Sequence, residues 1–431
     1  MTVVGVGVTA WARSGISGLV SNFSVVAGKA AQENSQLRFP VIVGKPKKQN
    51  TSSILADKDV QKYLQSLPKP TYLFVYKSTK KVEEWVDKLG MRLIGNRAEV
   101  RDRYEDKRQF RVIGREVGLP LVEGETMRIG ELMDRKLGVV VQLTDYSRGG
   151  GVGTWFMRKT EDWNQFDEFV RRRRQKRKLE WVNVTRLIEG TAASITGCVT
   201  RYGVLTGVVQ GQIIDQPELS GLAGRSGVWL GHDWSGQRFS QRVQDGAEKL
   251  VRDLGTYMAK RGYKGMFGMD LVVDKEERVW PIECNSRYTG AFPTYTWASM
   301  KNGEIPLDVW HLREFMDVPY EMDIEKIQQQ NRQPKQGAQI LMHNLEGVSV
   351  RVEGNVKAGP GWNLLHLEKP NEFVLTDGVP LQRQTLKPAE RLGRLLFNRA
   401  IVDQTGRLLP EVREVVKQLY RQFGLRKNVA E

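Results

Sequence analysis

Residues 265–290 read GMFGMDLVVDKEERVWPIECNSRYTG. Two apolar runs flank the charged turn DKEER, and this pattern predicts a β hairpin. Glu283 and Asn285 stand two residues apart, so their side chains share one face of the second strand, while Asp270 lies on the antiparallel partner. Two carboxylates and an amide that converge from one hairpin suit Mg²⁺, a hard cation whose shell phosphates and water can complete. The alternative is an ordinary strand end that carries acidic residues.

Strands and helices alternate upstream of this hairpin. TYLFVY (71–76) and MRLIGN (91–96) predict strands, and the helix between them carries an apolar stripe. Strand–helix–strand is the unit of an open parallel sheet, so the predicted class is α/β. FPVIVG (39–44) predicts a buried strand, whereas residues 1–38 fit either a strand and loop or a partly ordered leader.

Further elements follow from the same patterns. A helix is expected over 105–117, and apolar positions from Val243 to Met258 predict a long amphipathic helix. Residues 209–241 predict a long glycine-rich loop, and the polar stretch 325–337 predicts a linker. Further strands and an amphipathic terminal helix are expected in 338–431.

Here the sequence resembles a known superfamily. The set D-x12-E-x-N-x-R in 265–290 closely resembles the final metal-binding segment of ATP-grasp enzymes, such as D-Ala–D-Ala ligases and biotin carboxylases. The resemblance implies that Asp270, Glu283 and Asn285 hold two Mg²⁺ ions against the phosphates of ATP, with Glu283 bridging them and Mn²⁺ able to substitute. It also implies a catalytic role for Arg287, because a guanidinium there stabilises charge on an acyl-phosphate transition state.

The resemblance extends to a nucleotide site upstream. Lys107 matches the first ATP lysine, although on its own it could be an exposed helix lysine. The strand before the glycine-rich segment ends in Gln142, where the family usually has lysine; glutamine donates a hydrogen bond but lacks the charge. RLIEG (186–190) resembles the hinge that holds adenine and ribose. The nucleotide-binding residues implied are Lys107, Gln142, Ser147, Arg148, Gly149, Gly150, Gly151, Arg186, Ile188, Glu189 and Ser194.

The resemblance also implies an order of domains. An N-terminal α/β domain is expected over 1–104 and an ATP-grasp core over 105–325, with a lid subdomain over about 118–188. Residues 338–431 are expected to form a small extra domain. Two roles are open for that domain: it closes the acceptor site, or it mediates assembly into a homodimer.

The reaction implied is ligation. Most ATP-grasp enzymes phosphorylate a carboxylate and let an amine displace the phosphate, forming an amide or peptide bond. Positioning and electrostatics carry out such chemistry without a covalent nucleophile. Arg225, His232 and Asp233 are candidate substrate contacts, in a stretch that also reads as a surface loop. Two alternatives are a phosphotransferase on the same core and a nucleotide-regulated protein that binds nucleic acid or polyanions.

Composition bears on the partners. The net charge of +16 over 431 residues favours anionic ligands, including acidic substrates, whereas no nucleic-acid-binding module is recognisable. The basic run 171–178 reads either as a solvated helix face or as a funnel for a polyanion. Cys198 and Cys284 lie in apolar runs that predict buried thiols, which fits a cytoplasmic location. No apolar run approaches the roughly 20 residues that span a bilayer, and no signal peptide is apparent.

Overall fold

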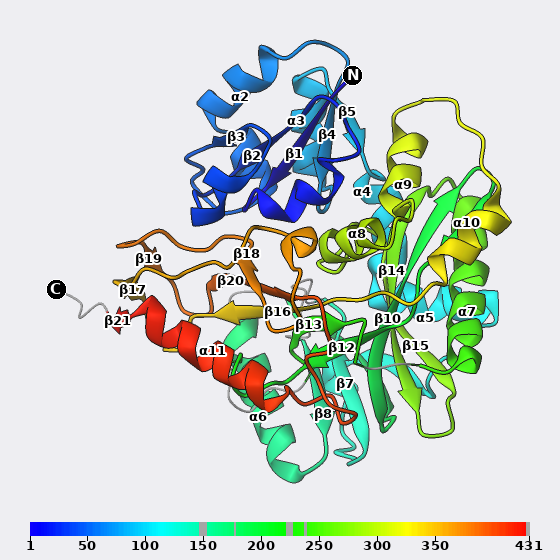
Figure 1. Ribbon diagram of the computed structural model, residues 1–431. Coiled ribbons are helices and arrows are strands. Elements are labelled where there is room, and N and C mark those ends of the chain that lie inside the picture. The colour runs from blue at the N-terminus through cyan, green and yellow to red at the C-terminus, as the bar shows by residue number, and fades with distance from the viewer. Residues whose placement is uncertain (146–152, 176–177, 221–226, 237–238, 428–431) are drawn as a thin grey trace.

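The N-terminal segment forms a five-stranded parallel sheet in the order β3-β2-β1-β4-β5 (Figure 1). Its central strand β1 is buried along its whole length, and residues 1–38 contribute this strand and β2 to the sheet. β3 is short and partly exposed, which corrects the expectation of a buried strand, because it is an edge strand that pairs only with β2. The strands are β1 (Thr2–Gly7), β2 (Phe23–Ala27), β3 (Val41–Val43), β4 (Thr71–Val75) and β5 (Arg92–Ile94); the helices are η1 (Trp11–Ile16), η2 (Gln32–Gln36), α1 (Thr51–Leu55), α2 (Lys58–Gln65) and α3 (Lys80–Lys88).

This structure is a computed structural model that describes residues 1–145, 153–175, 178–220, 227–236 and 239–427. After the parallel sheet come two helices, and a four-stranded antiparallel sheet in the order β6-β9-β7-β8 follows with α6 packed on it. These elements are α4 (Ala98–Glu105), α5 (Lys107–Val117), β6 (Gly124–Arg128), η3 (Ile129–Glu131), β7 (Val139–Leu143), β8 (Thr154–Met157), α6 (Thr160–Arg174) and β9 (Trp181–Arg186).

A nine-stranded sheet forms the centre of the molecule, with the path β15-β14-β10-β12-β13-β16-β20-β18 and β11 paired to β10. β12 and β13 lie within 209–241, so the expected long loop is wrong: a short apolar run such as 213–214 pairs with a neighbouring strand despite the surrounding glycines. The elements up to the hairpin are β10 (Gly190–Thr200), β11 (Gly203–Thr206), β12 (Gln210–Ile214), β13 (Trp229–Asp233), α7 (Gln241–Ala259), β14 (Gly265–Asp274) and β15 (Val279–Asn285).

The C-terminal segment continues this same sheet. β16 pairs with β13, and β20 and β18 follow, while β19-β17-β21 form a small separate sheet with α11 nearby (Figure 1). The domain boundaries predicted at 104, 325 and 338 stay predictions. The remaining elements are α8 (Phe292–Lys301), α9 (Leu307–Phe315), α10 (Ile324–Asn331), β16 (Ala338–His343), β17 (Val350–Val352), η4 (Leu364–His366), β18 (Val374–Thr376), β19 (Thr385–Leu386), β20 (Arg391–Phe397), α11 (Pro410–Phe423) and β21 (Leu425–Lys427).

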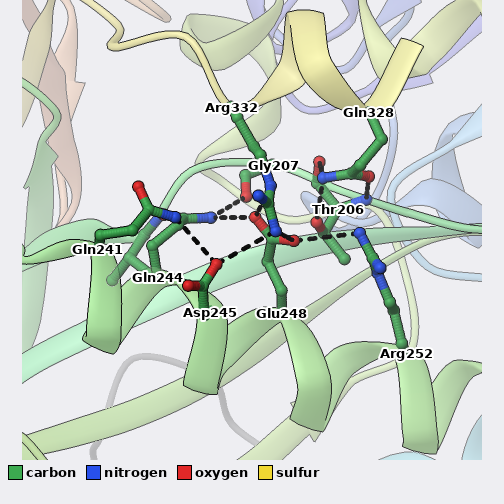
Figure 2. Close-up of polar contacts among 10 residues, drawn as sticks. Thr206, Gly207, Gln241, Gln244, Asp245, Glu248, Arg252, Gln328 and Arg332 are labelled. Atoms are coloured by element: carbon green, nitrogen blue, oxygen red, sulfur yellow. Dashed lines mark hydrogen bonds and ion pairs between the residues drawn. The ribbon is translucent and has the colours of Figure 1, made fainter. Parts of the chain in front are cut away.

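The expected linker 325–337 begins as helix α10, and polar contacts anchor it to α7 (Figure 2). Arg332 Nη2 lies 2.7 Å from Oε2 of Glu248, whose side chain is almost fully buried. Gln328 donates from Nε2 to Thr206 Oγ1 at 2.7 Å and accepts the Thr206 N–H at 2.9 Å. A buried carboxylate needs such partners, so these polar residues serve packing, which composition alone does not reveal.

Candidate functional site

The structure brings Asp270, Glu283 and Asn285 together. Asp270 on β14 lies directly opposite Glu283 on β15. Asn285 donates from Nδ2 to Oδ2 of Asp270 at 2.9 Å. From β12, Gln212 donates to the other carboxylate oxygen of Asp270 at 2.8 Å. The amides of Asn285 and Gln212 therefore hold the Asp270 carboxylate in place.

The two carboxylates are buried next to each other, with Lys107 and Arg287 as positively charged neighbours. Burial and the neighbouring Glu283 raise the pKa of Asp270. Burial opposes the ionisation of Glu283 too, but Lys107, with Nζ 2.5 Å from Oε2, lowers the pKa of Glu283. The pKa of Asp270 stays raised despite Arg287, so a bound cation would stabilise the ionised form of this pair of carboxylates.

The donor set fits Mg²⁺ rather than a transition metal. Within the described ranges, no cluster of three or more His, Cys, Asp or Glu residues is arranged to hold a metal. The hairpin offers two carboxylates and one amide, all oxygen donors, and leaves several coordination positions for phosphate and water oxygens. Mg²⁺ is commonly bound in this way next to a nucleotide.

Two donors face the hairpin from other elements. Lys107 is the first residue of α5, whose N-cap Asp106 accepts the backbone N–H groups of Arg108 and Gln109. Gln142 on β7 lies with its amide nitrogen 3.4 Å from the same Glu283 oxygen that Lys107 contacts. Both side chains were assigned to ATP from the sequence, and the fold places both beside the predicted metal ligands.

Arg287 is held by several groups next to Asn285. Its Nη2 donates to Asn285 Oδ1 at 2.7 Å, its Nε to Glu105 at 2.7 Å, and its Nη1 to the Tyr76 hydroxyl at 2.6 Å. Burial favours the neutral form of Glu105, but Arg287, Lys77 and Arg101 outweigh it and lower the pKa of this carboxyl to about 2. The Arg287 guanidinium is thus fixed in orientation beside the predicted metal ligands.

The predicted hinge lies between β9 and β10. Arg186, Ile188 and Glu189 line the same cavity as the hairpin. Glu189 is exposed and contacts Arg158 at 3.2 Å, while Ser194 is buried and accepts a hydrogen bond from Gln210 at 2.8 Å.

One cavity of about 1430 Å³ joins these groups. It runs from the hinge past the hairpin to the loop between β16 and β17 and to Arg391 at the start of β20. Pockets for one small molecule usually measure about 300–1,000 Å³, so this cavity has room for a nucleotide and a second substrate.

A protein-family model for the ATP-grasp domain matches residues 148–291, the stretch that ends just after the hairpin. The chain therefore carries an ATP-grasp domain over residues 148–291. Its predicted fold class is confirmed: a parallel N-terminal sheet precedes central and C-terminal antiparallel sheets. No curated protein matches the chain.

Solved structures with the ATP-grasp fold cover nearly the whole chain. The biotin carboxylase domain dimer of Hydrogenobacter thermophilus 2-oxoglutarate carboxylase, complexed with MgADP, ADP and bicarbonate, is 13% identical with a TM-score of 0.64, over 99% of this chain and 91% of that one. Campylobacter jejuni biotin carboxylase in complex with β,γ-ATP is 12% identical with a TM-score of 0.67, over 99% and 92%. Aspergillus clavatus N5-carboxyaminoimidazole synthase in complex with ADP and 5-aminoimidazole ribonucleotide is 13% identical with a TM-score of 0.57, over 96% and 99%. At these identities the likeness establishes the fold and leaves the substrate open.

Several residues that the sequence assigned to the ATP-grasp site fall outside the description. The nucleotide candidates Ser147, Arg148, Gly149, Gly150 and Gly151 and the substrate candidate Arg225 lie outside the described residues. Their assignments stay predictions.

Of the other two substrate candidates, Asp233 is corrected. Its side chain is fully buried, does not line the cavity, and accepts the backbone N–H groups of Ser235, Gly236, Ile401 and Val402. Four such bonds compensate a buried carboxylate, so Asp233 joins β13 to the segment after β20 and does not contact substrate.

His232 lines the cavity but is buried among hydrogen-bond partners. Its Nδ1 lies 3.0 Å from the amide nitrogen of Gln339, and its Nε2 lies 3.4 Å from Ser194 Oγ. Burial, reinforced by Arg394, lowers the pKa of His232 to about 3, so the ring is neutral. Both ring nitrogens are engaged, which favours a positioning role over substrate contact.

Sequence reasoning missed four residues of the site. Gln212 holds Asp270, Glu105 and Tyr76 hold Arg287, and Arg391 lines the far end of the cavity. Glu105 and Tyr76 each lie at an element end, a position that could have raised them as candidates. Gln212 and Arg391 carry no local signal, because only the pairing of distant strands brings them to the cavity.

Proposed function

We propose that this ATP-grasp protein is an ATP-dependent ligase that joins a carboxylate to an amine. The terminal phosphoryl group of ATP passes to a carboxylate oxygen, the amine nitrogen attacks the acyl carbon, and phosphate leaves. The products are an amide, ADP and phosphate. The observation that carries the proposal is the position of Arg287, hydrogen-bonded to Asn285 and lining the same cavity as Asp270 and Glu283.

Each group has a role in this scheme. Asp270, Glu283 and Asn285 would hold two Mg²⁺ ions, which neutralise phosphate charge when bound. Lys107 and Gln142 would donate to the nucleotide phosphates, and the hinge residues would bind adenine and ribose. Arg287, locked by Glu105 and Tyr76, would stabilise the negative charge that develops on the transferred phosphoryl group and the carboxylate.

The two cysteines and His232 are poorly suited to act as covalent nucleophiles. This supports direct transfer of the phosphoryl group from ATP to the substrate. Burial raises the pKa values of Cys198 and Cys284, so both remain thiols rather than reactive thiolates. His232 is neutral and has both ring nitrogens engaged. The buried free thiols also fit the predicted cytoplasmic location. None of the helices in the described part of the chain has the length and apolarity needed to cross a bilayer.

Bicarbonate belongs among the candidate carboxylates. It is a small anion with a carboxylate group, and it is present in the complex of the similar Hydrogenobacter thermophilus domain. Amino acids and acidic peptides are the larger candidates, and the cavity has room for them beside a nucleotide.

The test is turnover with defined pools. The purified chain is incubated with Mg-ATP and with pools of bicarbonate plus amines, amino acids, or acidic peptides, and ADP, phosphate and new masses are measured. The proposal predicts equimolar ADP and phosphate with an amide-linked mass, or a carbamate where bicarbonate is the carboxylate. Glu283→Gln should lose this turnover, while Glu276→Gln, in the exposed turn of the same hairpin, should retain it.

Two outcomes would contradict ligation. A stable phosphorylated product without amide would indicate a phosphotransferase. Absence of turnover in every pool, together with salt-sensitive binding of nucleic acid, would favour a binding protein.

A further inference from the structure

A second group of charged residues lies around Asp377, at the end of the cavity remote from the hinge. Asp377 is fully buried and accepts hydrogen bonds from Arg391 at 2.6 Å, from Arg394 at 3.0 Å and from Thr9 at 2.6 Å. Thr9 follows β1 in the N-terminal sheet, whereas the arginines lie on β20. The group therefore sits where the N-terminal and C-terminal segments meet.

Positive charge is in excess in this group. Arg13 is also buried, and it donates hydrogen bonds to the main-chain oxygens of Val6 and Ala12. Asp377 and Glu33 are the neighbouring carboxylates. Burial raises the pKa of Glu33 to about 7, so near neutral pH this group carries only part of a charge. Among the described residues, the guanidinium groups of the three arginines thus have only two neighbouring carboxylates, and one of these is only partly ionised.

Other nearby charges do not remove the excess. Lys29 and Glu390 contact each other at 3.4 Å and so cancel. Buried charge without a counter-charge is costly, and proteins compensate it with an ion pair or a bound ion. The excess therefore points to an anion that binds at this place.

Arg391 is the member of the group that opens onto the cavity. Its side chain is 35% exposed, whereas those of Arg394 and Asp377 are 2% and 0% exposed. Asp377 engages only Nη1 of Arg391, which leaves other N–H groups of the guanidinium available to a ligand. Arg391 is also the only one of the three arginines that lines the cavity in the described chain.

The neighbouring side chains suit an anion as well. His343 lies opposite Arg391 in the pairing of β16 with β20 and also lines the cavity. Burial, reinforced by Arg391, lowers the pKa of His343 to about 4, so it is a neutral hydrogen-bonding group. Asn344, next in the chain, is uncharged, and its side-chain amide is held by the main-chain oxygens of Val348 and Lys387, so it brings no competing charge. Among the described residues between 341 and 347, none that lines the cavity carries a carboxylate.

We propose that one of the two molecules joined in this cavity carries an additional anionic group, a carboxylate or a phosphate, which binds to Arg391. The proposal rests on the ligase function, which assigns the opposite end of the cavity to ATP. Guanidinium binds both anions through paired N–H donors, so Arg391 would select acidic substrates over neutral analogues of the same shape.

The test is calorimetric binding to the full chain saturated with Mg²⁺ and a non-hydrolysable ATP analogue, which fills the phosphate sites of the nucleotide. Two matched pairs of probes are titrated: L-glutamate against L-glutamine, and O-phospho-L-serine against L-serine. The acidic member of at least one pair should bind about ten-fold more tightly than its neutral partner. Arg391→Gln should abolish that preference, and Arg391→Lys should keep part of it.

Arg399→Gln is the matched control. Arg399 follows β20, pairs with one carboxylate, Glu411, at 3.0 Å, and does not line the cavity. Its loss should leave the preference unchanged. Thermal unfolding of each variant checks that the fold is intact, since Asp377 retains Arg394 when Arg391 is replaced.

The outcomes separate the sources of the anion. Preference for glutamate alone assigns a carboxylate, and preference for phosphoserine alone assigns a phosphate. The chain could bind the acidic probe through Arg391 and yet fail to bind the nucleotide. That result would support the anion site and contradict the proposed ligase function. Equal binding of acidic and neutral probes at concentrations up to about 10 mM, or a preference that survives Arg391→Gln, would overturn the proposal.

Discussion

The two ends of the cavity are built in different ways. At the ATP end, Asp270, Glu283 and Asn285 come from adjacent strands of one hairpin. At the opposite end, the hydrogen bond from Thr9 to Asp377 joins residues 368 positions apart. Residues that come from one hairpin show a recognisable spacing in the sequence. Residues that come from distant segments are brought together only when the sheets form.

The difference also concerns charge. The hairpin end presents two adjacent buried carboxylates, and the pKa of Asp270 stays raised beside Glu283, which suits metal ions. The Asp377 end presents the buried Arg394 and the partly exposed Arg391 around one carboxylate, which suits an anion. The two ends thus have opposite needs: Mg²⁺ ions bound with the nucleotide would meet the first, and an anionic group on a substrate would meet the second. The predictions below test each end in turn.

The largest effect is expected for Arg287→Ala. Loss of this guanidinium should lower kcat by about 100- to 1,000-fold, with little change in the KM for ATP, because its charge is needed in the transition state. Steady-state release of ADP measures both constants. Arg278→Ala removes an arginine of the same hairpin that pairs with Asp274 away from the cavity, and should be nearly silent. An equal loss of kcat in the two variants would contradict a catalytic role for Arg287.

A pH-dependent effect is expected at the other end. Glu33 is fully buried and accepts backbone N–H groups of Gly378 and Val379, and burial raises its pKa from 4.5 to about 7. Between about pH 4.5 and 7 the native chain therefore binds more protons than the unfolded chain. The free energy of unfolding falls as the pH rises through this window.

Glu33→Gln removes that titration. Between pH 5 and pH 8, wild-type stability should fall relative to the variant by about 3 kcal/mol, as followed by urea unfolding. Glu414→Gln, an exposed replacement on α11, should keep the wild-type slope. If wild type and Glu33→Gln shift in parallel, Glu33 does not titrate in this range.

The smallest effect is expected for Gln142→Lys, which restores the residue usual in the superfamily. A charged donor in place of an amide should tighten nucleotide binding by about five-fold, measured by calorimetry with Mg-ADP. Gln333→Lys adds the same charge on an exposed loop and should have no effect. Weaker binding in Gln142→Lys would mean that Gln142 holds Glu283 and does not face a phosphate.

The sequence predicts the local elements of the fold better than those that depend on distant segments. Periodicity located the hairpin, α7 and the strand–helix–strand unit, because each buries one continuous face. It failed over 209–241, where β12 and β13 are short and flanked by glycines, and over 325–337, where polar residues make buried contacts. The buried contact of Gln328 on α10 is with Thr206 on β11, and Arg332 after α10 contacts Glu248 on α7. In both places contact with a distant segment decides the structure.

The residues of the site differ in the same way in how well the sequence predicts them. Residue types at fixed spacing predicted Asp270, Glu283, Asn285 and Arg287, and the structure brings them together. Asp233 was mistaken for a substrate contact because the sequence does not reveal that backbone N–H groups around residues 235 and 401 engage it. The charge excess around Asp377 was equally invisible, since its members come from three separate segments.

The most direct test is a titration with Mn²⁺ followed by electron paramagnetic resonance, in the presence of ADP or a non-hydrolysable ATP analogue. The wild-type chain should bind two Mn²⁺ ions with the nucleotide, and Glu276→Gln should bind the same number. The double variant Asp270→Asn, Glu283→Gln should lose both ions, because two carboxylates bring the charge that the ions require. Undiminished Mn²⁺ binding by the double variant would contradict the assignment of the hairpin as the metal–nucleotide site.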